Sequence, residues 1–170
     1  LLQWVEPGTA TMMQIGDLSH FSTALFHYAK GLGGSKQQAF IQSTLKKLVA
    51  DSGLDPTLEQ SWRTIGLSPK SGAVLFTHGS STQPVLVMGL HEPSTFDKFI
   101  QHTIKKHATR LTMQRGSDQG HPYYTLIQTN TSGTEPAMHW TYLKSCVVMV
   151  GAKNIAAVHQ LIQRAKYPPK

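Results

Sequence analysis

The segment that decides the fold consists of two apolar runs, Ala73–His78 (AVLFTH) and Pro84–Leu90 (PVLVMGL). Both runs are short and rich in β-branched and aromatic residues, which is typical of strands. The polar loop between them, Gly79–Gln83, has a length suited to a hairpin. We therefore predict two antiparallel strands here and place the other elements around them.

Further strands are predicted from short apolar or alternating runs, which are bounded by glycine or polar turns. The predicted strands are Thr11–Ile15, Arg110–Arg115, Tyr123–Thr129, Met138–Leu143 and Cys146–Val150. Two segments between them, Ser117–Gly120 and Asn130–Glu135, are rich in turn residues and are predicted as loops. The pattern gives a sheet of five to seven strands.

Helices are predicted where apolar residues recur with a period of three to four. One begins at Ser19, the predicted cap, and carries Phe21, Leu25 and Tyr28 on one face. The others are a helix over Lys36–Asp51, one that begins at Asp55-Pro56, one that begins at a capping-box-like Ser94–Asp97, and one that is capped by Asn154. The pairs Gly31-Leu32, Gly53-Leu54 and Gly66-Leu67 are predicted helix stops.

The overall composition indicates one soluble domain. The chain has 170 residues, of which 39% are hydrophobic, and its formal net charge is +7. Charged residues make up only 15% of the chain, below the usual fraction of about 25%, so the positive charge reflects scarce acids rather than abundant bases. This disfavours a nucleic-acid-binding protein, which accumulates lysine and arginine. The apolar runs are too short for a membrane helix.

The sequence gives little support for a catalytic site or a metal site. The single cysteine, Cys146, excludes an internal disulfide and a cysteine-rich zinc site, and its apolar run predicts an inert core thiol. The nine histidines lack the spacing of metal ligands, although His78 and His91 could approach each other across the hairpin. No G-x-S-x-G elbow is present. We predict no catalytic residue, no metal and no cofactor.

The middle of the chain resembles a family of uncharacterised bacterial cell-envelope proteins that is catalogued as a domain of unknown function. The resemblance rests on Gly53-Leu54-Asp55-Pro56, on Gly66-Leu67-Ser68-Pro69, and on the strand–strand–helix order that follows them. It implies export to the periplasm or the outer membrane, possession of a lipid anchor in some members, and a binding or assembly role. Because the chain starts at Leu1 without a methionine, we expect it to be one lobe of a longer protein.

The sequence therefore predicts a single α+β domain whose antiparallel sheet is covered by helices on one face. The expected function is a non-enzymatic binding or structural module of an envelope protein, with another protein or an envelope component as its partner. Recognition would use exposed aromatic residues, for which Trp4, Trp140 and Tyr142 are the candidates. The alternative is nucleic-acid binding through Lys105, Lys106, Arg110 and Arg115, and a third possibility is a hydrolase with an unrecognised site.

Overall fold

The structure is a computed structural model of the chain. It describes residues 1–5, 9, 11–32, 39, 42–43, 46–47, 49–50, 53–77, 83–130 and 133–166. Most of the predicted helix over Lys36–Asp51 lies outside these residues, as do His78 and most of the predicted hairpin loop.

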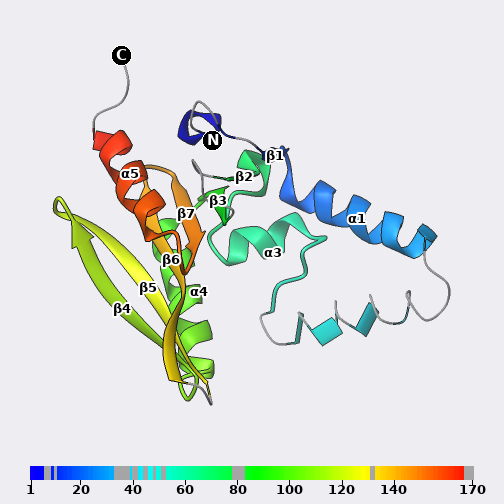
Figure 1. The fold of residues 1–170 in the computed structure, drawn as a ribbon. Coiled ribbons are helices and arrows are strands. Elements are labelled where there is room, and N and C mark those ends of the chain that lie inside the picture. The colour runs from blue at the N-terminus through cyan, green and yellow to red at the C-terminus, as the bar shows by residue number, and fades with distance from the viewer. Residues whose placement is uncertain are drawn as a thin grey trace.

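A seven-stranded sheet forms the centre of the molecule (Figure 1), and all of its neighbouring strands are antiparallel. Its strands are β1 (Met12–Ile15), β2 (Ala73–Thr77), β3 (Pro84–Gly89), β4 (Leu111–Asp118), β5 (His121–Asn130), β6 (Gly133–Leu143) and β7 (Cys146–Gly151). Their order across the sheet is β1-β2-β3-β7-β6-β5-β4. The predicted strand pair is confirmed as β2 and β3, and β3 and β7 form the middle of the sheet.

The strands β4, β5 and β6 are longer than predicted. The turn between β4 and β5 contains only Gln119 and Gly120, both with positive φ, and most of the predicted Asn130–Glu135 loop belongs to β5 and β6. The added residues are mainly polar residues, glycine and proline, so they carry no hydrophobic alternation that could mark a strand. Pairing with the neighbouring strand, rather than an apolar pattern, extends β4, β5 and β6.

Four helices have defined bounds, and the described residues at positions 39–50 are helical as well. The four are α1 (Leu18–Leu32), α3 (Glu59–Thr64), α4 (Pro93–Lys106) and α5 (Ile155–Lys166), and short 3-10 turns cover Leu2–Trp4 and Pro69–Ser71. Helix α1 continues through the predicted stop at Gly31, and α3 begins three residues later than the predicted Pro56.

The caps of α1 and α4 also differ from the predicted ones. The α1 cap is Asp17, whose Oδ1 accepts the backbone N–H of Ser19 at 2.9 Å and of His20 at 3.0 Å. The α4 cap is Glu92, whose carboxylate accepts the Ser94 backbone N–H at 3.3 Å. In both cases a carboxylate just before the predicted serine satisfies the free N–H groups of the first turn.

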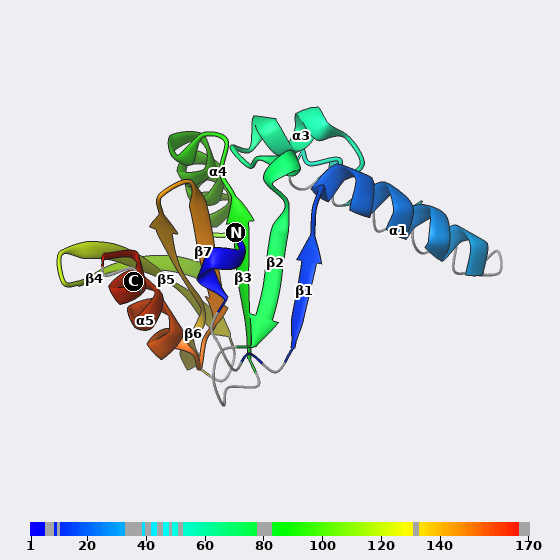
Figure 2. The ribbon, with the colours of Figure 1, turned by 90° about the horizontal axis from the view of Figure 1, so that it is seen from above.

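Helices pack on both faces of the sheet, so the prediction that they cover one face only is not confirmed (Figure 2). On the α5 face, Val87 and Val148 are fully buried together with Val158 of α5. On the α4 face, Phe96 of α4 packs with Trp140 and neighbouring residues. Alternate residues of each strand thus enter two separate cores.

Gly66 joins α3 to the body of the protein. Its φ of +85° is a conformation that glycine adopts without strain, and its carbonyl accepts the backbone N–H groups of His91 at 2.9 Å and of Glu92 at 3.0 Å. Gly53 has a similar φ of +72°. The predicted stops at these two positions are confirmed.

Candidate functional site

The aromatic residues predicted as exposed binding candidates are mostly core residues. Trp4 is only 4% exposed and Trp140 only 1%, so the prediction of exposure is wrong for both. Tyr142 is partly buried, its hydroxyl donates to Asp97 Oδ1 at 3.2 Å, and burial raises its pKa. Tyr124 stacks on Trp140 with a centroid distance of 5.3 Å, and α4 covers this aromatic group. The face that these aromatics share therefore belongs to the core.

Three of the four predicted cationic residues lie around the end of α4, and the fourth lies apart from them. Lys105 and Lys106 end α4, and Arg110 lies on the turn that leads into β4. Backbone hydrogen bonds from His107 to Ile104 and from Leu111 to His107, both 3.0 Å long, close this turn. Arg115 lies further along β4, roughly 16 Å from Arg110 at the usual strand rise. Together they do not form a continuous basic surface.

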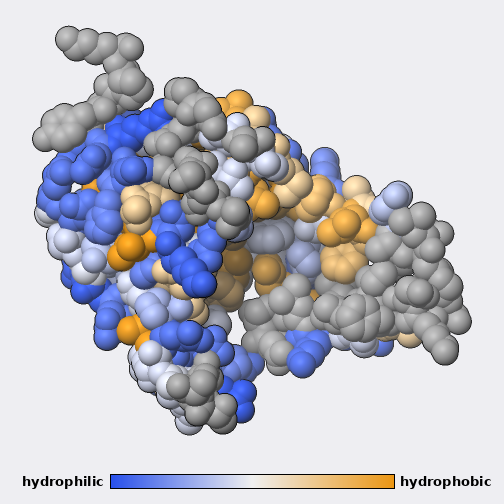
Figure 3. All heavy atoms as spheres, viewed as in Figure 1, coloured by the Kyte–Doolittle hydropathy of each residue, from blue (hydrophilic) through white to orange (hydrophobic). Residues whose placement is uncertain are grey.

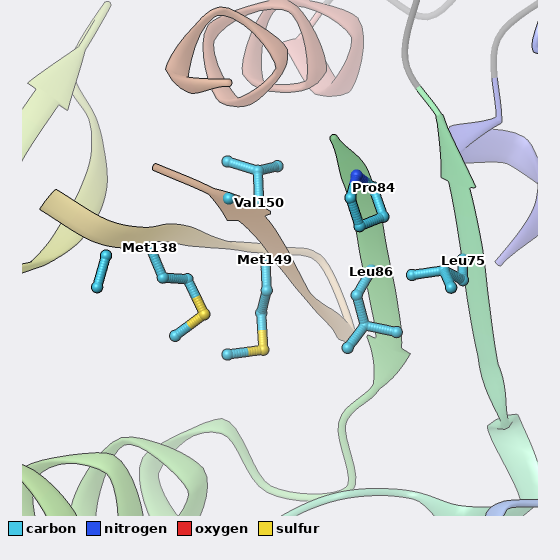
Figure 4. A pocket seen from close by; sticks show the side chains of 8 residues that line it. Leu75, Pro84, Leu86, Met138, Met149 and Val150 are labelled. Atoms are coloured by element: carbon cyan, nitrogen blue, oxygen red, sulfur yellow. The ribbon is translucent and has the colours of Figure 1, made fainter. Parts of the chain in front are cut away.

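An apolar trough occupies the part of the α4 face that α4 leaves uncovered (Figure 4). It has a volume of about 310 Å³. Its lining residues are Leu75, Pro84, Leu86, Ala137, Met138, Met149, Val150 and Gly151. In Figure 4, Leu86, Met138 and Met149 point to the same side of the sheet, away from α5. We call this surface the trough.

A second apolar cavity of about 140 Å³ lies beneath the C-terminal half of α4. It is lined by Ile100, Thr103, Ile104, Leu111, Leu126, Met138 and Trp140. The Thr103 hydroxyl already donates to the Phe99 carbonyl at 2.9 Å. Met138 lines both the cavity and the trough.

The apolar surface continues from the trough to the sheet edge. The strand register places one row of side chains on the α4 face, in the order Met13, Leu75, Leu86, Met149 and Trp140. Met13 is 45% exposed on the edge strand β1.

The predicted apolar stripe of α1 is exposed as well. The exposed fractions of Phe21, Leu25 and Tyr28 are 39%, 51% and 66%, so exposure rises along the helix. Figure 3 shows hydrophobic surface extending from the body of the molecule along α1. Contiguous apolar surface of this kind marks binding sites in soluble proteins.

Catalytic geometry is incomplete among the described residues. His159 Nδ1 lies 2.9 Å from Asp118 Oδ2, which gives a base and an orienting carboxylate, but no hydrogen bond from His159 to a serine is found in this part of the chain. The buried His139 is bound to Thr125 at 2.8 Å and to the Ala152 carbonyl at 3.0 Å. No group of three metal-ligating side chains occurs within the described ranges.

Sequence reasoning missed the trough. Its signal was present, because Leu75, Leu86 and Met149 are apolar residues on the side of each strand opposite to the α5 core. Strands with apolar residues on both sides predict a sheet that is covered on both faces. The sequence does not show that α4 stops short of β2 and β3.

The comparisons with known proteins do not name a relative. No family model, curated protein or solved structure matches the chain. Among the described residues, no helix combines the length and the apolar character that crossing a membrane requires.

Proposed function

We propose that the chain is a non-catalytic binding module of a bacterial cell-envelope protein and that it binds through the trough. The observation that carries this proposal is the trough itself, an apolar surface beside the middle of the sheet with no covering element among the described residues. Concave apolar surfaces of a few hundred Å³ are the usual form of binding sites. The assignment to the envelope rests on the resemblance carried by Gly53–Pro56 and Gly66–Pro69.

Site-specific photo-crosslinking in the native cells tests the binding role. A benzophenone amino acid at Leu86 lies in the trough, whereas the same residue at the exposed Lys98 on α4 serves as the control. We expect an adduct, to lipid or to protein, at position 86 that is absent at position 98. Equal labelling at the two positions, or none at either, would contradict the proposed role.

Cell fractionation tests the location. We expect the native protein to be recovered with the periplasmic or outer-membrane fraction. Recovery with a cytoplasmic marker enzyme would contradict the envelope assignment while leaving the binding role to the crosslinking experiment.

A further inference from the structure

We propose that the trough and the adjoining cavity bind the alkyl chain of a free long-chain carboxylate, whose head group lies at the basic end of α4. This inference rests on the proposed function, because it names the ligand of the same site. Three features of the described residues support it: the chemistry of the lining, the extent of the apolar surface, and the charge at one end.

The lining selects an apolar ligand. Most of the residues around the two spaces have aliphatic or thioether side chains, and the hydroxyl of Thr103 is already used by the Phe99 carbonyl. Among the described residues, Trp140 adds one buried donor to the cavity lining, its Nε1, which has no hydrogen-bond partner there. A ligand with several polar groups along its length would lose most of its hydrogen bonds to water without replacement, which is costly. An alkyl chain has no such groups. The methionine side chains of Met138 and Met149 can adapt to a chain that enters from the trough.

The apolar surface has the extent of a long alkyl chain. The lining runs across the sheet from Leu126 on β5, through Met138 on β6 and Met149 on β7, to Leu75 on β2. Four strand-to-strand steps separate β5 from β2, which corresponds to about 19 Å. The two spaces adjoin at Met138, which lines both, and its thioether side chain is flexible.

Positive charge lies at one end of this path. Ile104 and Leu111 line the cavity, and their immediate neighbours in the chain are Lys105 and Arg110. Lys106 and Glu135, which is opposite Gln128 at this end of the sheet, each already take part in another interaction. Lys105 and Arg110 are exposed and make this end positive, whereas the residues that line the trough at β2 and β3 carry no charge. This end is therefore complementary to a carboxylate head group.

Isothermal titration calorimetry of the whole chain tests the inference, with sodium dodecanoate as the probe below its micelle concentration. We expect saturable binding of dodecanoate and binding at least about tenfold weaker for dodecyltrimethylammonium, which has the same chain and the opposite charge. Hexanoate, with a short chain, should bind far more weakly than dodecanoate because less apolar surface is buried.

Two sets of variants locate the site. Leu86→Gln places a polar amide in the trough and should weaken dodecanoate binding about tenfold, with circular dichroism as the check on folding. The exposed pair Lys105→Gln and Arg110→Gln should weaken it up to about fivefold without altering the fold, since exposed ion pairs contribute up to about 1 kcal/mol. Lys98→Gln is the matched control and should have no effect.

Lack of dodecanoate binding would overturn the inference, as would equal affinity for the cationic probe. Flotation with phosphatidylglycerol vesicles in the absence of dodecanoate binding would identify a membrane surface rather than a free carboxylate and would also overturn it. If a protein adduct forms at Leu86 in cells while dodecanoate does not bind, the ligand assignment fails and the binding role stands. If both experiments are negative, both proposals fail.

Discussion

Asp17 holds the first turn of α1 through two backbone N–H groups and the Ser19 hydroxyl, which donates at 2.7 Å. We expect Asp17→Ala to lower the free energy of unfolding by about 1 kcal/mol at pH 7, the usual value for loss of a helix cap. Urea denaturation measures the change. Asp17→Asn keeps an acceptor at the cap and should remain near the wild-type stability.

The same residue gives a pH dependence with a defined sign. The hydrogen bond from the His20 backbone, together with the Ser19 hydroxyl, holds the pKa of Asp17 below its usual value of 3.8. Its contribution is therefore complete above pH 3.8 and is lost as the pH falls through the lower pKa of the folded state. The stability difference between wild type and Asp17→Ala should shrink between pH 5 and pH 2. A difference that stays constant over this range would contradict the assigned cap.

Cys146 tests the burial of the α5 core. Burial raises the pKa of its thiol to about 11, and the Sγ donates to the Leu143 carbonyl at 2.9 Å. Because the thiolate is the reactive form, we expect alkylation by iodoacetamide at pH 8 to be at least about a hundredfold slower in the native protein than in guanidinium. Mass spectrometry of the single modified cysteine measures both rates. Similar rates would show that β7 is accessible in the native state.

For single residues, the sequence predicted the chemical behaviour of a side chain better than the elements that pack around it. The inert thiol of Cys146 follows from its apolar neighbours, and the structure confirms its burial. The predicted exposure of Trp140 was wrong for a physical reason. A two-residue spacing on a strand shows that two aromatic residues share a face, but it does not show whether a helix covers that face. That depends on Phe96 and Ile100, which are at least 40 residues away in the chain.

Among the elements, the turn at Gly66 allows a sharp comparison with Gly53. A methyl group at Gly66 would lie 2.4 Å from the Phe96 backbone nitrogen and 2.5 Å from the Glu92 carbonyl oxygen, whereas one at Gly53 would meet nothing within 4 Å. We expect Gly53→Ala to cost about 1 kcal/mol, which is the strain of positive φ alone. Gly66→Ala should cost about 3 kcal/mol or more, because the start of α4 must also move. Equal costs in thermal unfolding would contradict this packing.

The elements themselves were largely predictable where apolar periodicity is strong. The pairing of β2 with β3 and the positions of α4 and α5 follow from it. The ends of β4, β5 and β6 were not predictable, since polar residues such as Ser117 and Thr134 are held in the sheet by pairing alone. Propensity is local, whereas strand pairing depends on a partner strand.

For the molecule as a whole, the strand order predicts a gradient of protection against hydrogen exchange. Amides of β3 and β7 are paired on both sides and lie between two cores, whereas β1 is a four-residue edge strand with exposed Met12 and Met13. We expect the slowest exchange in β3 and β7 and rates at least about a hundredfold faster in β1. Mass spectrometry after peptic digestion measures both. Equal protection of β1 would indicate that another chain covers this edge.

The large-scale architecture was partly accessible from the sequence. The α+β class and the number of strands agree with the prediction, whereas helices on both faces of the sheet were not predicted. The β3–β7 pair shows the reason, because its Val87–Val148 contact joins residues that are far apart in the chain, and local patterns do not encode such distances.

The same pairing has a consequence for synthesis on the ribosome. Strand β3 is made early, but its neighbour β7 emerges only after α4, β4, β5 and β6. Until then the nascent chain presents an unpaired inner strand edge that carries Val85 and Val87. Such an edge is prone to intermolecular pairing. Ribosome-stalled chains that end before Cys146 should therefore recruit chaperones, and chains that extend beyond Lys166 should release them.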